Sequence, residues 1–143
     1  MNIDLVCTWE EARHADVSGR TAVVIDVLRA TSTMAAALHA GARSVHTVAT
    51  EEHARRPAEG WGRDKSILGG ERESVRIPGF DLGNSPREYT GDVVSGKRVV
   101  MTTTNGTQAV DAVAEADAVA CAALVNAGAC IEWLRENGQD III

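Results

Sequence analysis

The sequence predicts an α/β fold built on a mostly parallel or mixed sheet. Short apolar runs rich in β-branched residues recur along the 143 residues, and stretches of about ten residues with helix-forming composition lie between them. Strands that alternate with helices in this way are typical of βαβ units. A chain of this length can bury roughly 68–70% of its unfolded surface. We therefore expect residues 1–143 to form a single α/β domain.

The first third of the chain follows this pattern closely. Thr21–Leu28 (TAVVIDVL) is expected to be a buried strand, because β-branched and apolar residues dominate it. Thr31–Ala40 is expected to be a helix, which begins with hydroxyl residues and ends at Gly41. The other elements expected here are strands at Ile3–Cys7 and Arg43–Thr50, and a short helix over Glu51–Arg56 that Pro57 ends.

The segment Glu59–Thr90 breaks the pattern, because glycine, proline, asparagine and charged residues crowd together in it. A long irregular segment in a compact domain is usually functional or disordered. We expect it to be a loop that carries functional residues.

Regular alternation returns after this segment. A strand at Lys97–Thr103 and a helix at Gly106–Ala116 flank the sequence TTTNGT. The buried-strand composition at the end of the sequence suggests that the chain is the N-terminal part of a longer one. The remaining expected elements are a strand at Ala118–Leu124, a helix at Ala127–Asn137 and a strand at Asp140–Ile143.

Composition and charge exclude several classes of protein. The net charge of −6 argues against a nucleic-acid-binding protein, which usually carries a basic face. No apolar stretch approaches 18 residues, and the N-terminus lacks the basic region of a signal peptide, so we expect no membrane segment. The three cysteines, in or beside apolar runs, are expected to be reduced, buried thiols of a cytoplasmic protein. The sequence leaves a homo-oligomer open.

Two phosphate-binding patterns fail on their context. Gly91–Lys97 fits G-x-x-x-x-G-K, but Arg98 follows where a serine or threonine is needed, and the segment precedes a strand. We expect a turn there. Cys7–Arg13 has the C-x₅-R spacing of cysteine phosphatases, but its two glutamates would repel both a phosphate and a thiolate.

The first motif of interest is Asp26–Thr33 (DVLRATST). Asp26 interrupts an apolar run near the carboxyl end of its strand, which is the edge where parallel α/β sheets bind ligands. A carboxylate there is costly unless it meets a metal or a cation. Arg29 follows three residues later. The alternative is that Asp26 merely pairs with Arg29 and that the hydroxyl residues only cap a helix.

The second motif is Gly69–Pro86 (GGERESVRIPGFDLGNSP). Its hard oxygen donors, Glu71, Asp81 and Asn84, suit Mg²⁺, which prefers carboxylates together with waters and substrate phosphate. Arg72 adds a cation. The alternative is a surface loop whose aspartate and asparagine satisfy turns.

The third motif is Thr102–Thr107 (TTTNGT), between a strand and a helix. Thr104 or Asn105 is expected to cap the helix, whose first free amides could bind an anion. Gly106 would let the backbone approach a phosphate or sulfonate closely. The alternative is an ordinary helix cap.

Taken together, four segments make the chain resemble the 2-phosphosulfolactate phosphatase family over about residues 23–126. They are VVIDVLRATST, LGGER, IPGFDLGNSP and GKRVVMTTTNGT. The resemblance implies a three-layer α/β/α fold. It also implies Mg²⁺-dependent hydrolysis of 2-phospho-3-sulfolactate to 3-sulfolactate and phosphate, a step towards coenzyme M. Members of the family continue beyond the position of Ile143 with further acidic motifs.

The hypothesis for the site combines the three motifs. Asp26, Glu71 and Asp81 are expected to be metal ligands or acid/base groups, with Mg²⁺ either activating a water or supporting attack by Asp26. Arg29 and Arg72 are expected to clamp the anionic groups of the substrate, and Arg29 counts among the catalytic residues. The residues expected to position the substrate are Asn84, Thr103, Thr104, Asn105, Gly106 and Thr107.

Two other readings stay open at this point. The chain could be a non-catalytic or truncated anion-binding module, or a phosphatase that acts on another small phosphate ester. A phosphatase of the haloacid-dehalogenase type is discounted, because its D-x-D motif would need an aspartate at Leu28.

Overall fold

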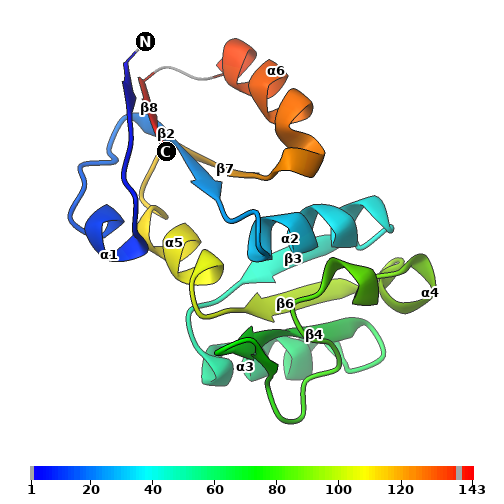
Figure 1. The fold of residues 1–143 in the computed structure, drawn as a ribbon. Coiled ribbons are helices and arrows are strands. Elements are labelled where there is room, and N and C mark those ends of the chain that lie inside the picture. Colours follow the sequence, from blue (N-terminus) through cyan, green and yellow to red (C-terminus); the bar gives the residue numbers. More distant parts are fainter. Residues whose placement is uncertain (1, 138–139) are drawn as a thin grey trace.

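The computed structural model describes residues 2–137 and 140–143, and it confirms the α/β fold. The strands form two four-stranded sheets in the orders β1-β8-β2-β7 and β3-β6-β4-β5, and every pairing is parallel except that of β4 with β5 (Figure 1). The strands of the first sheet are β1 (Ile3–Asp4), β2 (Arg20–Ile25), β7 (Ala118–Ala122) and β8 (Asp140–Ile142). Those of the second are β3 (Ser44–Thr47), β4 (Ser66–Arg72), β5 (Val75–Arg76) and β6 (Arg98–Thr102).

Helices join and cover the strands, and α2 and α5 lie between the two sheets (Figure 1). Among the described residues no helix has the length and apolar character needed to cross a membrane. The α-helices are α1 (Trp9–Ala12), α2 (Ala30–His39), α3 (Glu51–Trp61), α4 (Gly91–Val94), α5 (Gly106–Ala112) and α6 (Ala127–Asn137). Short 3₁₀ helices occupy Pro86–Glu88 (η1) and Leu124–Asn126 (η2).

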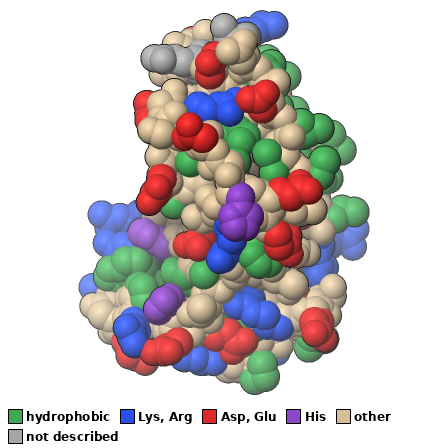
Figure 2. Space-filling view, turned by 90° about the vertical axis from the view of Figure 1, so that its left-hand side faces the viewer, with side chains coloured by type: hydrophobic (Ala, Val, Ile, Leu, Met, Phe, Trp, Pro, Cys, Tyr) green, Lys and Arg blue, Asp and Glu red, His purple; other side chains and the backbone are tan. Residues whose placement is uncertain are grey.

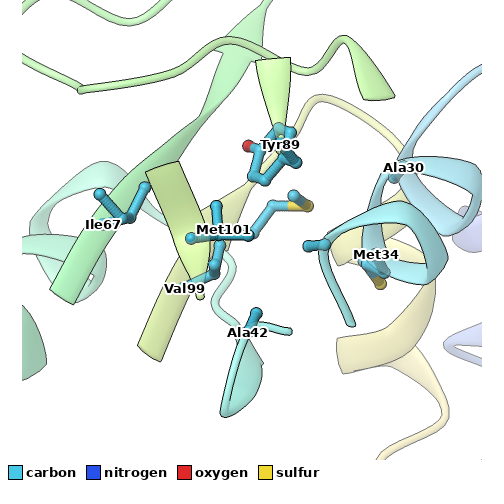
Figure 3. Close-up of a cluster of buried hydrophobic side chains, with 9 residues drawn as sticks. Ala30, Met34, Ala42, Ile67, Tyr89, Val99 and Met101 are labelled. Atoms are coloured by element: carbon cyan, nitrogen blue, oxygen red, sulfur yellow. The ribbon is translucent and has the colours of Figure 1, made fainter. Parts of the chain in front are cut away.

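Each sheet carries buried side chains on both of its faces. In the second sheet, Val99 and Met101 pack beneath α2, whereas Val100 between them packs on the side of α3 (Figure 3). In the first sheet, Val24 packs towards α1 and α5, and the adjacent Val23 packs towards α6. Neighbouring residues of a strand point to opposite faces, so both sheets are sandwiched between helices. The predicted three-layer α/β/α arrangement therefore holds in each half.

The prediction that Pro57 ends its helix is wrong. Pro57 lies inside α3, which continues to Trp61. A proline inside a helix removes one backbone hydrogen bond and crowds the preceding turn. Here the fully buried Ala54 and Ala58 pack α3 into a cluster on the second sheet, and this tertiary packing outweighs the local cost.

The segment Glu59–Thr90 is not one long loop, because it contains β4, a central strand of the second sheet. Its glycines suggested a loop, but they are required by packing. A Cβ atom at Gly69 would collide with the Tyr89 hydroxyl, and one at Gly70 would collide with the carbonyl oxygen of Thr102. Glycine in a strand often marks such a close approach.

Two short helices and one cysteine also differ from expectation. The helix α1 forms within Cys7–Arg13, and α4 occupies part of the segment where only a turn was expected. Cys7 is exposed rather than buried. Cys121 is half-buried, and burial, followed by the influence of Cys130, raises the pKa of its thiol.

Candidate active site

A cavity of about 170 Å³ lies at the carboxyl ends of β2 and β4. We call this cavity the cleft. All three sequence motifs contribute to it, as the position at the ends of parallel strands favours. The residues that line it are Asp26, Leu28, Arg29, Glu71, Glu73, Ser74, Asn84, Thr104 and Asn105.

Asp26 follows directly after the last residue of β2. Thr31 at the start of α2 fixes its backbone: the Asp26 N–H donates to Thr31 Oγ1 at 3.0 Å, and that hydroxyl donates to the Asp26 carbonyl oxygen at 2.7 Å. The carboxylate itself makes no hydrogen bond or ion pair with any described residue. The turn thus holds a carboxylate whose oxygens are left for a ligand.

Arg29 lines the same cleft, and its guanidinium forms no hydrogen bond or ion pair within residues 2–137 and 140–143. The alternative that Asp26 and Arg29 simply pair with each other is therefore wrong.

Over the face of the molecule in Figure 2, acidic and basic side chains are interspersed. The charge that a ligand meets in the cleft is consequently set by the groups that line it.

Glu71 is only 7% exposed and is held by three hydrogen bonds. Its Oε1 accepts from the Thr104 N–H at 2.8 Å, and its Oε2 accepts from the Ser74 N–H at 2.7 Å and the Thr104 hydroxyl at 3.1 Å. Burial raises the pKa of the carboxyl, but these hydrogen bonds and the Arg72 charge outweigh burial, so the pKa lies below its ordinary value. Glu71 is thus a buried, ionised carboxylate at the wall of the cleft.

Asn84 is 5% exposed and carries an unsatisfied polar atom. Its Oδ1 is buried and has no hydrogen-bond partner among the described residues, although the residue lines the cleft. Most buried polar atoms in proteins have a partner, so an orphaned acceptor of this kind points to a group that is bound there.

Some side chains of the turn Thr103–Thr107 hold the turn together, and others line the cleft. Thr103 Oγ1 accepts from the Thr107 N–H at 3.1 Å, and Thr107 Oγ1 accepts from the Thr103 N–H at 2.8 Å. Both side chains are buried and neither lines the cleft, so they brace the turn. Asn105 and Thr104 line the cleft. Asn105 occupies the N-cap position of α5, as expected, but its side chain makes no capping hydrogen bond. Gly106 packs directly against Asp26.

Arg72 lies outside the cleft. Its guanidinium donates to the Glu71 carbonyl oxygen at 2.8 Å, to Thr102 Oγ1 at 2.8 Å and to the Ala49 carbonyl oxygen at 3.3 Å. It lines a neighbouring cavity of about 490 Å³ together with Thr103 and other residues. Arg72 thus ties the ends of β4 and β6 to the segment after β3.

Asp81 also lies outside the cleft, so the expected convergence of Asp26, Glu71 and Asp81 does not occur. Its carboxylate pairs with Arg63 at 2.8 and 3.0 Å and accepts from the Leu68 N–H at 2.8 Å. Leu68 and Glu71 are three residues apart on β4 and so project to opposite faces, and Leu68 packs on the side of α3. Within the described parts of the chain, no three His, Cys, Asp or Glu side chains are grouped to hold a metal.

The donors that remain fit Mg²⁺. Asp26 and Glu71 supply carboxylate oxygens, and Asn84 supplies an orphaned carboxamide oxygen. Magnesium ions in proteins usually take one or two carboxylates, keep several waters and bind substrate phosphate, so this ion does not require three grouped carboxylates.

Some residues that shape the cleft were not identified from the sequence. Ser74 holds Glu71 through its backbone, and Glu73 lies beside it, both in the tight turn between β4 and β5 with positive φ angles of 69° and 51° respectively. Leu28 was considered only as the wrong residue for another motif, yet it lines the cleft. The charged, glycine-poor turn after Glu71 gave no signal that would have singled these residues out.

The comparisons with known proteins agree with the motifs. The family model described as 2-phosphosulpholactate phosphatase matches residues 6–143. A protein from Clostridium acetobutylicum named "Probable 2-phosphosulfolactate phosphatase" is 43% identical over 143 residues, which is all of this chain and 60% of that protein. A protein of the same name from Synechococcus sp. is 49% identical over 116 residues, which is 81% of this chain and 48% of that protein. The chain thus spans no more than about 60% of the length of these curated relatives.

Proposed function

Because the chain belongs to the 2-phosphosulfolactate phosphatase family, we propose that it hydrolyses 2-phospho-3-sulfolactate to 3-sulfolactate and inorganic phosphate at the cleft. The reaction breaks the bond between phosphorus and the ester oxygen and forms one between phosphorus and a water oxygen. One proton of that water ends on the alcohol of 3-sulfolactate. The chain would act in the cytoplasm, on a step towards coenzyme M.

The observation that carries the proposal is the pair of unpartnered charges at Asp26 and Arg29. Both residues are half-buried and line one cavity, yet neither charge is paired with the other or with another described residue. Their separation makes sense if each binds a part of the ligand. Arg29 would donate charge-assisted hydrogen bonds to the anionic oxygens of the substrate, and Asp26 would hold a cation.

The cation is proposed to be Mg²⁺, held by Asp26 and Glu71, with the Asn84 oxygen beside them. When bound, it would neutralise charge that develops on the phosphoryl oxygens and activate a water. Without a cation, the carboxylates that line the cleft, Asp26, Glu71 and Glu73, would repel a phosphate dianion, because like charges in a partly desolvated cleft disfavour one another.

The residues around these groups keep them in place. The Thr104 and Ser74 amides hold Glu71 ionised at neutral pH, so that it remains a metal ligand or an acceptor for a proton. Asn105 and Thr104 would position the substrate. Arg72 would act by holding the strand ends together rather than by clamping the substrate.

A second candidate is an anion-binding module that does not catalyse hydrolysis, or a phosphatase for another small phosphate ester. The module is favoured because, among the described residues, no three His, Cys, Asp or Glu side chains are grouped closely enough to hold a metal, although Glu73 also lines the cleft. Arg29 and Asn84 would serve binding equally well in it.

A phosphate-release assay separates these candidates. The chain and the longer Clostridium acetobutylicum relative would each be given 2-phospho-3-sulfolactate with Mg²⁺, and simple phosphate monoesters in parallel. The proposal predicts release from 2-phospho-3-sulfolactate above that from the simple esters. Binding of the substrate by the chain without release would favour the anion-binding module. Equal release from all esters would move the function to another phosphate ester.

A further inference from the structure

The segment that carries Asn84 is fastened by hydrogen bonds from two other elements. The Tyr89 hydroxyl donates to the Gly83 carbonyl oxygen at 2.8 Å, and the Gly83 N–H donates to Glu88 Oε2 at 2.9 Å. From α2, the Thr33 hydroxyl donates to the Asn84 carbonyl oxygen at 3.1 Å. The backbone on both sides of the Asn84 Cα is therefore fixed.

Tyr89 is a deeply buried donor. It is 2% exposed, and its ring lies in the apolar cluster between α2 and the second sheet, next to Met101 (Figure 3). Burial and, to a lesser degree, the Glu88 charge raise the pKa of its phenol above the ordinary value, so the hydroxyl stays protonated and keeps donating. Gly69 has no side chain, and the Tyr89 hydroxyl occupies the space that a Cβ atom would need.

A fixed Asn84 backbone affects the cleft only if the Asn84 side chain contacts a ligand there. Asn84 is the residue whose buried Oδ1 has no partner and which lines the cleft. An amide oxygen accepts hydrogen bonds and binds hard cations, so its missing partner is a cation or a hydrogen-bond donor.

We propose that Tyr89 is a positioning residue: by holding the Gly83 carbonyl, its hydroxyl places the Asn84 carboxamide where it contacts the cation or donor bound with an anionic ligand in the cleft. The inference rests on the proposed function for the identity of that ligand. The inference extends the proposed function by assigning a role to a buried phenol that touches neither substrate nor metal. Groups that orient a binding residue in this way commonly contribute about 10–100-fold to metal affinity or activity.

The test is Tyr89→Phe, which keeps the ring and removes the hydroxyl. Binding of inorganic phosphate in the presence of Mg²⁺, measured by calorimetry, is expected to weaken by about 10–100-fold. In an Asn84→Ala background the same change should alter binding by less than about twofold, because the residue being positioned is gone. A purely structural role would weaken binding equally in both backgrounds, and that result would overturn the proposal.

Two controls guard against loss of the fold. Val99→Ala truncates a side chain in the same apolar cluster and removes no hydrogen bond, so it should lower the melting temperature but leave phosphate binding unchanged. If Tyr89→Phe does not fold, Thr33→Val removes the other donor with little change of volume and should show the same dependence on Asn84. Equal loss of binding in Val99→Ala would contradict a specific role for Tyr89.

A readout without any ligand separates this inference from the proposed function. The side-chain amide signals of Asn84 in a ¹⁵N NMR spectrum, assigned with Asn84→Ala, should shift or broaden in Tyr89→Phe. A shift in a protein that neither binds phosphate nor hydrolyses the ester would support the positioning role while the proposed function fails. Unchanged Asn84 signals would overturn the positioning role, whatever the activity.

Discussion

Gly106 lies directly against the Asp26 carboxylate: a Cβ atom at position 106 would be 2.5 Å from Asp26 Oδ2. The same atom would collide with the side chain of Ala30 at the start of α2. The sequence suggested that this glycine makes room for a phosphate, but its space is taken by a carboxylate. The beginning of α5 and the end of β2 are therefore packed so closely that only glycine fits between them.

Gly106→Ala should accordingly disturb the site as well as the fold. The added methyl group must push Asp26 or Ala30 aside, and overpacking of this kind typically costs about 1–3 kcal/mol of unfolding free energy. Denaturant unfolding and phosphate release would both be measured, and both should fall. Gly128→Ala is the matched control, because nothing lies within 4 Å of its Cβ position in α6, and it should be neutral or slightly stabilising. A Gly106→Ala protein as active as the wild type would show that activity does not depend on the present position of the Asp26 carboxylate.

The two arginines of the original clamp hypothesis should behave differently. Arg29→Ala should weaken phosphate binding by about 1.5–3 kcal/mol, the range for charge-assisted hydrogen bonds, with little effect on stability. Arg72→Ala removes three hydrogen bonds from the strand ends and should lower the unfolding free energy by about 1–3 kcal/mol. Calorimetry and urea unfolding separate the two effects.

The control for both variants is Arg43→Ala, an exposed arginine just before β3, at the opposite edge of the sheet from the cleft. It should change neither quantity. Unaltered phosphate binding in Arg29→Ala would remove Arg29 from the site.

Glu71 should make part of the stability depend on pH. Its pKa is lower in the folded protein than the ordinary value of 4.5, so the unfolded chain binds the proton more readily. The stabilisation is therefore fully present above pH 4.5 and is lost as the pH falls through the folded-state pKa. In Glu71→Gln, the unfolding free energy should fall less steeply between pH 5 and pH 3 than in the wild type.

The exposed Glu115, replaced by glutamine, serves as the control for this pH profile and should leave it unchanged. An equally steep profile in Glu71→Gln would mean that the hydrogen bonds to the Glu71 carboxylate do not stabilise its ionised form.

How far the sequence predicted the structure depended on the range of the interactions involved. The helix Ala127–Asn137 was predicted with its observed bounds, because it follows from a local pattern. The strand expected at Thr21–Leu28 runs from Arg20 to Ile25, so Asp26 lies just after its carboxyl end rather than inside it. The strand β4 was missed because Gly69 and Gly70 are required by contacts with residues far along the chain, which no local pattern contains.

The site shows the same limit. The sequence indicated that Asp26 and Glu71 belong together, and they do line one cavity. The sequence could not show that Asp81 pairs with Arg63 on the α3 side of β4. This pairing depends on how Asp81 packs against β4, and β4 was not recognised as a strand. The orphaned oxygen of Asn84 depends in the same way on groups that only the fold brings near.

The most direct test of the account compares Asp26→Asn with Asp81→Asn, two identical changes of which only the first falls in the cleft. Mg²⁺ binding would be titrated calorimetrically in each, and phosphate release from 2-phospho-3-sulfolactate would be followed with Mg²⁺ and with excess chelator. The account predicts that the wild type loses activity in chelator and regains it with Mg²⁺. It predicts that Asp26→Asn weakens Mg²⁺ binding by about 10–100-fold, whereas Asp81→Asn lowers stability and leaves Mg²⁺ binding nearly unchanged. Full activity in chelator, or wild-type Mg²⁺ binding in Asp26→Asn, would contradict it.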